Sequence, residues 1–425
     1  MDILKNFNVT KYEGNLVNGI KITLFYRPGA PITTTAILRS GSKYDPYESP
    51  GISHFIEHMI MNGSPEFPSK DLLSEHIESV GGSYSASTNQ DFLFVNTEIS
   101  DKEDYGRVGD IFNATLCRPL LDKEKFENEK QIVINEIRKS NSNPNQILNN
   151  TAIRLFFKNT PFGHEVMGNE QSISKLGYDE MISEHKKLFD ESRITFVASG
   201  DISLEEITSH LNKLIFLEGK TFTETNKQLE PTNANDTLAT FLDTPHSYIC
   251  FGVPAPDLLS KEYLHLNLLG SILAGGRASR LTKILRYDRG LIYNVSHGRV
   301  GGLQHGYWKI NTDTSEDMVQ EVINIIINEI KNISLVGIKD SELDFVKNRS
   351  LKSLKRTMQT SGDWVNFHSV AETQTQKYDI NAYSKIVQET TADDIKKVID
   401  KYLGLDNWQL ALCGRNKAES ININL

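Results

Sequence analysis

The stretch Gly51-Ile-Ser-His-Phe-Ile-Glu-His-Met-Ile60 constrains this chain more than any other part of its sequence. His54 and His58 stand four positions apart in it, and residues with that spacing lie on one face of an α-helix, one turn above the other. Both imidazoles can therefore bind a single metal ion. Glu57 lies one turn beyond His54, close enough to reach the same ion. A tetrahedral zinc ion bound by two histidines needs a third protein ligand and a water, so we expect a carboxylate or histidine from a second rigid element.

A simpler interpretation is a surface helix that carries two histidines by chance. The chain has 11 histidines among 425 residues, and short motifs do produce false matches. However, Phe55, Ile56 and Met59 make this helix apolar, and a polar side chain in apolar surroundings costs free energy unless it meets a partner. The context therefore favours a metal site.

Length, composition and charge exclude several classes of protein. A chain of 425 residues is too long for one ordinary core, so two or more packed units are expected. Its 38% hydrophobic and 24% charged residues are typical of a soluble globular protein. The net charge of −9 and the lack of a Lys/Arg-rich block argue against a nucleic-acid partner. No apolar run reaches 18 residues, so we expect no membrane span.

The cysteines indicate a reducing compartment. Cys117, Cys250 and Cys413 are odd in number, far apart in the sequence and set among apolar residues, which predicts buried thiols rather than a disulfide framework. The amino terminus has no apolar run of signal-peptide length. The predicted location is the cytoplasm.

The first half of the chain alternates strand and helix signals. Residues 6–40 alternate apolar and polar, with Asn18-Gly19 as a hairpin signal, which predicts two or three antiparallel strands. Further along, the expected helices span 52–61, 71–80, 105–117 and 122–140, the expected strands span 83–97 and 193–201, and 141–190 is mostly helical. Glu129 and Glu136 stand seven positions apart on the helix at 122–140, hence on one face and two turns from each other.

Residues 217–236 are polar, contain Pro231 and lack an apolar period, which is typical of a linker. Beyond them the order of elements recurs: strands are expected at 248–253, 292–295 and 408–414, and helices at 260–274, 316–335, 340–358 and 380–402. We infer a degenerate duplication of about 200 residues. The expected fold is α+β with two homologous domains, each an antiparallel-rich sheet with helices packed on one face. The first domain, 1–216, would carry the zinc site; the linker, 217–236, would lead to the homologous carboxy-terminal domain, 237–425.

With these residues in view, the chain resembles the pitrilysin-type metallopeptidases, in particular their short, processing-peptidase-like branch. In that family a glutamate ligand stands on a separate helix some 75 residues after the inverted motif, and Glu136 stands 78 positions after His58. The resemblance implies that His54, His58 and Glu136 bind Zn²⁺, that Glu129 orients a ligand histidine and that Glu57 is the general base. The simpler interpretation of Glu129 and Glu136 is two solvated glutamates on an exposed helix.

Two further segments match the family. Arg286 and Tyr293, in Leu285-Arg-Tyr-Asp-Arg-Gly-Leu-Ile-Tyr293, resemble its Arg/Tyr element, which reaches a zinc site from the partner subunit and holds the substrate backbone or the forming oxyanion. The simpler interpretation of these two residues alone is a helix arginine in a surface ion pair and a core tyrosine. The segment 82–91 resembles the family's edge strand, on which a peptide lies by β-augmentation, with Ser85 and Ala86 as binding residues. Ser85 departs from the usual asparagine and has a shorter reach.

The resemblance implies a zinc-dependent endopeptidase that hydrolyses short or unfolded peptides inside a chamber formed by a dimer. Because the chain retains both the zinc motif and the Arg/Tyr element, we expect a homodimer. Two alternatives stay open, namely one half of a heterodimeric peptide-maturation protease and a non-catalytic assembly subunit of the same fold. The sequence lacks a Gly-x-Ser-x-Gly motif, and none of its cysteines has a polar setting, so nothing in it indicates a covalent nucleophile.

Overall fold

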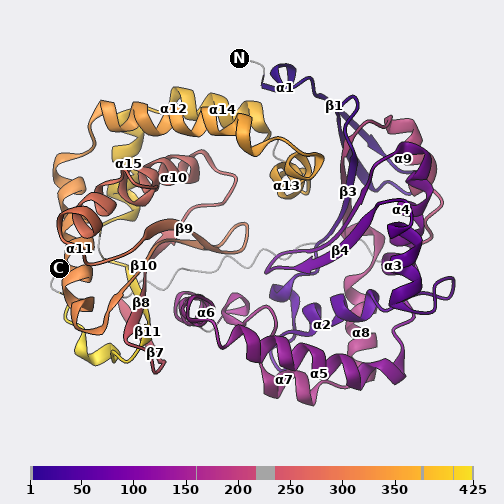
Figure 1. The fold of residues 1–425 in the computed structure, drawn as a ribbon, viewed down its shortest axis with the longest axis horizontal. Helices are drawn as coiled ribbons and strands as arrows, with labels where there is room; N and C mark the ends of the chain where they lie inside the picture. The colour runs from indigo at the N-terminus through magenta and orange to yellow at the C-terminus, as the bar shows by residue number, and fades with distance from the viewer. Residues whose placement is uncertain (1–2, 159, 217–234, 375–377, 405, 424–425) are drawn as a thin grey trace. The chain divides into compact units, whose positions relative to one another are not determined.

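The computed structural model describes residues 3–158, 160–216, 235–374, 378–404 and 406–423 (Figure 1). The predicted linker, 217–236, lies outside the described residues except for its last two, and Asp236 already begins a strand. No helix in these ranges combines the length and the apolar character needed to cross a membrane.

The chain forms two compact units, each assembled from three segments. The first unit contains Met1–Ile137, Val166–Asn226 and Leu354–Ser384, and the second contains Arg138–Glu165, Lys227–Ser353 and Lys385–Leu425. Each unit therefore includes one segment from the opposite half of the sequence. The predicted domains, 1–216 and 237–425, are instead continuous in sequence. They describe the two homologous halves of the chain, and their boundaries stay a prediction.

The first unit holds a six-stranded sheet in the order β1-β2-β6-β3-β5-β4. Its strands are β1 (Thr10–Asn15), β2 (Lys21–Tyr26), β3 (Ile32–Leu38), β4 (Ser83–Thr88), β5 (Leu93–Ile99) and β6 (Ile194–Gly200). β1 and β2 form the predicted hairpin, with Gly19 at φ 88° in its turn. β2 pairs with β6 in parallel, while β3 pairs antiparallel with both β6 and β5. β4 pairs with β5 and ends the sheet, so no strand among the described residues lies along its outer edge.

The second unit repeats this topology in a five-stranded sheet, in the order β7-β11-β8-β10-β9. Its strands are β7 (Asp236–Phe241), β8 (His246–Ala255), β9 (Val295–Gly301), β10 (Gly306–Ser315) and β11 (Gln409–Gly414). β7 pairs in parallel with β11, as β2 does with β6. The series β11-β8-β10-β9 is antiparallel, like β6-β3-β5-β4. The order and sense of the strands agree with the predicted duplication and confirm an α+β fold with two homologous halves.

The helices form a main layer on one face of each sheet. Those of the first unit are α1 (Ile3–Asn6), α2 (Ile52–Ile60), α3 (Lys70–Glu78), α4 (Tyr105–Phe112), α5 (Lys123–Ser140), α7 (Glu170–Lys175), α8 (Tyr178–Leu188), α9 (Leu204–Leu211) and α13 (Ser361–Glu372). The second unit has α6 (Pro144–Phe156), α10 (Lys261–Ala274), α11 (Val319–Val336) and α15 (Ala392–Tyr402), and α12 (Asp340–Thr357) and α14 (Ile380–Glu389) each contribute residues to both units.

One helix from the other half of the chain covers the opposite face of each sheet. In the first unit α13 packs on β2, β3 and β6, and Figure 1 shows it on the side of β3 away from α4 and α9. There Trp364 and Val365 join Phe25, Ile37 and Val197 in a buried cluster. In the second unit α6 packs in the same way on β7, β8 and β11. Both faces of the central strands are therefore buried, which explains why every residue of β3 and β11 is buried.

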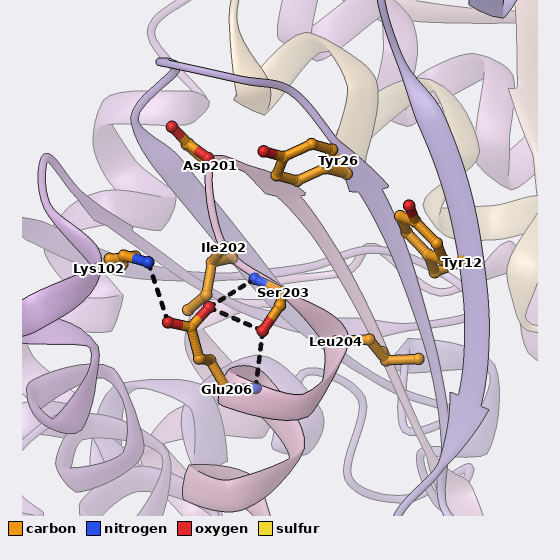
Figure 2. Close-up of a pocket in the computed structure, with 8 residues that line it drawn as sticks. All are labelled: Tyr12, Tyr26, Lys102, Asp201, Ile202, Ser203, Leu204 and Glu206. Carbon is orange, nitrogen blue, oxygen red and sulfur yellow. Dashed lines mark hydrogen bonds and ion pairs between the residues drawn. The ribbon is translucent and has the colours of Figure 1, made fainter.

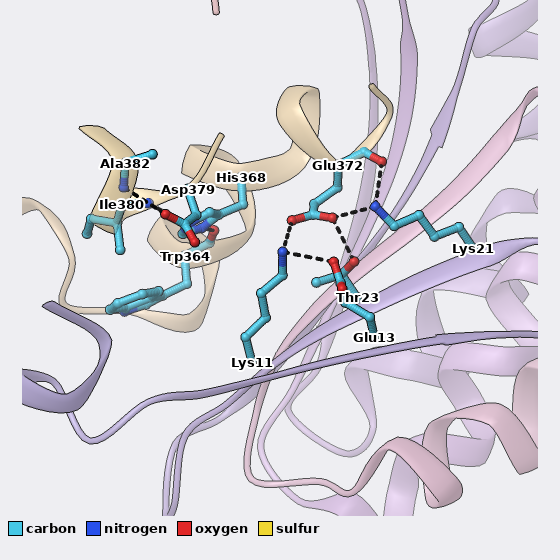
Figure 3. A network of polar contacts seen from close by, with 10 residues as sticks. All are labelled: Lys11, Glu13, Lys21, Thr23, Trp364, His368, Glu372, Asp379, Ile380 and Ala382. Atoms are coloured by element: carbon cyan, nitrogen blue, oxygen red, sulfur yellow. Dashed lines mark hydrogen bonds and ion pairs between the residues drawn. The ribbon is translucent and has the colours of Figure 1, made fainter. Parts of the chain in front are cut away.

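A buried carboxylate ties α13 to the first two strands (Figure 3). Glu372, with 5% of its side chain exposed, lies 2.6 Å from the ammonium of Lys11 on β1 and 2.6 Å from that of Lys21 on β2. The hydroxyl of Thr23 also donates to it. Burial alone would raise the pKa of Glu372, but the two lysines outweigh it and lower that pKa below its ordinary value.

The structure differs from the element predictions in four places. The strand expected at 83–97 is two strands, because Asn89 accepts hydrogen bonds from the backbone N–H groups of Asp91 and Phe92 and turns the chain. The helix expected at 380–402 is likewise divided, by an N-cap at Thr391. The strand expected at 292–295 begins only at its last residue. No element was expected at 361–372, where α13 lies.

Candidate metal centre

The helix α2 carries the motif on a thoroughly buried body. Ile52, Phe55, Ile56, Met59 and Ile60 are all at most 1% exposed. Gly51 precedes the helix at φ 93°, and a Cβ there would lie 2.5 Å from the carbonyl oxygen of Met167, so only glycine fits. The packing fixes the direction in which the polar residues of the motif project.

A buried aspartate anchors the first turn of α2. The carboxylate of Asp45 accepts hydrogen bonds from the N–H of Gly51 (2.7 Å), the N–H of Ser53 (3.1 Å) and the hydroxyl of Ser53. These contacts satisfy backbone donors that the helix itself leaves without partners. Burial raises the pKa of Asp45 to about 7, although the three hydrogen bonds act in the opposite direction. The anchor orients the turn that leads directly into His54.

The structure brings the three predicted ligands together. One ligand atom from each of His54, His58 and Glu136 lies within 4.8 Å of the other two. Oε2 of Glu136, on α5, is 3.3 Å from Nε2 of His58 and 3.9 Å from Nε2 of His54. A tetrahedral site with bonds of about 2.1 Å separates its ligand atoms by about 3.4 Å, so these distances suit zinc. Two imidazoles and a carboxylate are also a donor set that catalytic zinc sites use.

Burial and neighbouring charges shift the pKa values of the two imidazoles in opposite directions. Burial, and then the neighbouring His58, lowers the pKa of His54 to about 3, so its ring is uncharged at neutral pH. Nδ1 of His54 is buried and no described residue gives it a hydrogen-bond partner. Burial alone would also lower the pKa of His58, but the carboxylates of Glu129, Glu136 and Glu57 outweigh it and raise that pKa.

Glu129 contacts His58 from the far side of the ring, where its Oε2 lies 3.4 Å from Nδ1. Burial alone would raise the pKa of Glu129, but the contacts with His58 and Asn62 and the charge of Lys70 together outweigh it and lower that pKa. This is the arrangement of a carboxylate that orients a ligand histidine.

Glu57 lies beside the three ligand residues in a largely buried position. Burial raises its pKa above the ordinary value, although the hydrogen bond from Thr88 opposes that shift. The hydroxyl of Thr88, at the end of β4, donates to Oε2 of Glu57 over 2.6 Å. A carboxylate whose pKa is raised toward neutral pH suits a group that both accepts and returns a proton.

A cavity of about 350 Å³ opens beside these residues. Glu57, His58, Glu129 and Glu136 line it together with residues of α3 and with Ser85 and Ala86 of β4. The edge strand β4 and two of the candidate ligands, His58 and Glu136, therefore line one cavity. Its other lining residues are Met61, Asn62, Lys70, Ser74, Glu78 and Tyr84.

Arg286 and Tyr293 belong to the second unit. Arg286 lies in the π-helical segment Thr282–Asp288, and its guanidinium carbon is 4.7 Å from the centre of the Tyr293 ring. Tyr293 is 76% exposed. The guanidinium of Arg286 therefore lies over the ring of Tyr293 within the second unit.

A second cavity of the first unit, about 490 Å³ in volume, lies between β1, β2 and the start of α9 (Figure 2). Figure 2 shows the carboxylate of Glu206 between Lys102 and Ser203. Asp201 accepts from the N–H of Gly29. The carboxylates of Glu206 and Asp201 in this cavity thus already accept hydrogen bonds from other groups of the protein, and we base no function on the cavity.

Sequence reasoning missed Thr88 and Asp45. Alternation along a strand could have indicated Thr88, because it stands two positions after Ala86 and hence on the same face. Nothing local marks Asp45, since its partners lie six and eight positions further on and depend on the turn between them.

The geometry defines a duplicated α+β protein whose first half brings the imidazoles of His54 and His58 and the carboxylate of Glu136 together, beside a cavity that Glu57 also lines. Comparisons agree with this class. Residues 27–170 match the family model described as Insulinase (Peptidase family M16), and residues 175–350 match the Peptidase M16 inactive domain. The chain belongs to the M16, pitrilysin-type, peptidase family, as the sequence resemblance predicted.

Relatives and solved structures cover almost the whole chain. The uncharacterized zinc protease YmxG of Bacillus subtilis is 21% identical, over 93% of this chain and 96% of its own length. A peptidase M16 inactive domain from Pseudomonas fluorescens has a TM-score of 0.87 at 17% identity, covering 96% and 98% of the two chains. A protease from Helicobacter pylori has a TM-score of 0.86 at 16% identity, covering 96% and 99%. At these identities the two structures establish the fold alone.

Proposed function

We propose that this protein is a zinc-dependent endopeptidase that hydrolyses short or unfolded peptides. The observation that carries the proposal is the convergence of His54, His58 and Glu136 from two helices, with Glu57 beside them. The names of relatives such as the zinc protease YmxG also support it.

Each residue then has a chemical task. His54, His58 and Glu136 would hold Zn²⁺, and Glu129 would orient His58. When bound, the ion supplies Lewis acidity toward the scissile carbonyl and lowers the pKa of a water molecule to about 7. Glu57 accepts the proton of the attacking water at its carboxylate and passes it to the leaving amine nitrogen, so that the amide C–N bond breaks as the new C–O bond forms.

The substrate would lie along β4, whose outer edge offers backbone N–H and C=O groups to an extended peptide. Ser85 and Ala86 are the proposed contact residues on that strand. We further propose that the chain works as a homodimer, in which Arg286 and Tyr293 of one subunit serve the zinc site of the other. The three cysteines are free and buried, which supports a reducing, cytoplasmic location.

The test is to measure zinc content and hydrolysis of a quenched peptide in the same preparations. We expect close to one zinc per chain, loss of zinc in His54→Ala and Glu136→Gln, and retained zinc with hydrolysis about 10²–10⁴-fold lower in Glu57→Gln. His246→Ala is the matched control, because His246 is exposed at the start of β8. A zinc-free protein indifferent to EDTA would favour the non-catalytic assembly subunit. A zinc-loaded protein inactive on its own would favour half of a heterodimer.

A further inference from the structure

We infer that Thr88 is a positioning residue, whose hydroxyl holds the Glu57 carboxylate in the orientation in which it receives a proton from water. This inference rests on the proposed function. It begins from the hydrogen bond of 2.6 Å from Oγ1 of Thr88 to Oε2 of Glu57, which joins residues 31 positions apart.

The hydrogen bond from Thr88 leaves one oxygen of the Glu57 carboxylate available to accept a proton. Thr88 occupies Oε2, and no other described residue makes a hydrogen bond to this carboxylate. Oε1 is therefore the oxygen left to accept a proton. A glutamate side chain rotates around three bonds, so fixing the position of one carboxylate oxygen removes most of the conformational freedom of the other. Catalysis by a general base depends on reach within hydrogen-bond distance, which this contact maintains.

Thr88 is itself held firmly. It is the last residue of β4, where it pairs with Leu93 of β5. The turn that follows is closed by the Asn89 side chain, which accepts from two backbone N–H groups. Three backbone hydrogen bonds then fix the turn to the segment before α2: Gly41 to Asp91, Ser42 to Asn89 and Lys43 to Gln90. The ammonium of Lys43 also lies 2.8 Å from the carboxylate of Asp91.

The same segment is connected to the helix that carries Glu57. Asp45 stands two residues after Lys43 and accepts the first N–H groups of α2. Gly41 permits the close approach, because a Cβ at that position would lie 2.5 Å from backbone atoms of Asn89, Asp91 and Phe92. The donor Thr88 and the acceptor Glu57 thus belong to one rigid frame. Because the frame fixes the orientation of the catalytic group before the reaction, little orientational entropy is lost when the reaction occurs.

The experiment compares Thr88→Val, which keeps the shape and loses the hydroxyl, with Thr88→Ser, which keeps the hydroxyl. Thr97→Val is the matched control: it loses a buried hydroxyl bond to the Thr34 carbonyl from the neighbouring strand β5. In zinc-loaded protein with a quenched peptide, we expect kcat about 10–100-fold lower in Thr88→Val, KM within about twofold and most of kcat regained in Thr88→Ser. Zinc content should equal that of the unmodified protein, and Tm should fall no further than in Thr97→Val.

Several results would overturn the inference. One is a Thr88→Val variant with an unchanged kcat. Another is a loss of activity accompanied by an equal loss of zinc or matched by Thr97→Val, which would mean that the hydroxyl only stabilises the fold. A third is a Thr88→Ser variant as slow as Thr88→Val. If the unmodified, zinc-loaded protein cleaves no peptide, the proposed function itself is overturned, and the inference with it.

Discussion

Nδ1 of His58 lies 3.4 Å from Oε2 of Glu129, across two helices and 71 positions of sequence. Both side chains are largely buried, with 18% and 11% exposed. In a neutral imidazole, the nitrogen that faces a carboxylate carries the proton and the other keeps its lone pair. That other nitrogen, Nε2, is the atom 3.3 Å from Glu136. The contact therefore selects the tautomer of His58 that can bind a metal.

Replacing Glu129 should weaken zinc binding without removing a ligand. In Glu129→Gln the side chain keeps its shape but loses the charge that fixes the tautomer, so we expect zinc affinity about 10–100-fold lower in competition with a chelator. Glu127→Gln is the matched control, because Glu127 lies on the same helix and is 74% exposed. Equal zinc affinities in the two variants would contradict the assigned role of Glu129.

The Asp45 anchor should make stability depend on pH. Its pKa is raised by burial to about 7, above that of an aspartate in the unfolded chain, so the folded state binds a proton that the unfolded state releases between about pH 4 and 7. This contribution to stability is complete below about pH 4 and is lost as pH rises through 7. In denaturant unfolding of the metal-free protein, the advantage of the unmodified chain over Asp45→Asn should fall by up to about 1.4 kcal/mol per pH unit from pH 5 to 7 and level off above. A difference that rises with pH would refute this.

The Glu372 network should matter for the stability of the first unit. In Glu372→Ala, Lys11 keeps Glu13 but loses Glu372, and Lys21 loses its carboxylate partner inside the sheet–helix contact. Because Lys21 is 36% exposed, we expect a loss of about 2–3 kcal/mol in the free energy of unfolding, below that of a fully buried pair. Glu13→Ala, at a position 39% exposed, should cost less than about 1 kcal/mol. Equal losses in urea unfolding would mean that burial of Glu372 contributes nothing.

Much of the site could be predicted from the sequence, because its geometry is local. Residues four apart on a helix share a face whatever surrounds them, so the pairing of His54 with His58 follows from spacing. Spacing also places Glu129 and Glu136 on one face of α5. Which helix that face meets is a tertiary relationship, and only the family resemblance supplied it.

The parts that escaped prediction depend on packing between distant segments. Both α6 and α13 cover a sheet face in the unit opposite to their own half of the chain, and no local pattern indicates which sheet a helix will cover. A continuous buried strand such as β3 does indicate that both faces are covered, but not by what. Thr88 and Asp45 share this difficulty, since each acts through a partner placed by a turn.

The proposed dimer makes one prediction that no single chain could satisfy. If Arg286 and Tyr293 serve the zinc site of the partner, Glu57→Gln and Tyr293→Phe are each inactive for different reasons. In a mixed dimer one site then carries both substitutions and the other carries neither. Random exchange makes half of the dimers mixed, so mixing the two inactive variants should restore about a quarter of the unmodified activity toward a quenched peptide. Mixing Glu57→Gln with Glu57→Gln/Tyr293→Phe is the control and should restore none. Failure of recovery, with subunit exchange verified, would show that each zinc site is built from one chain.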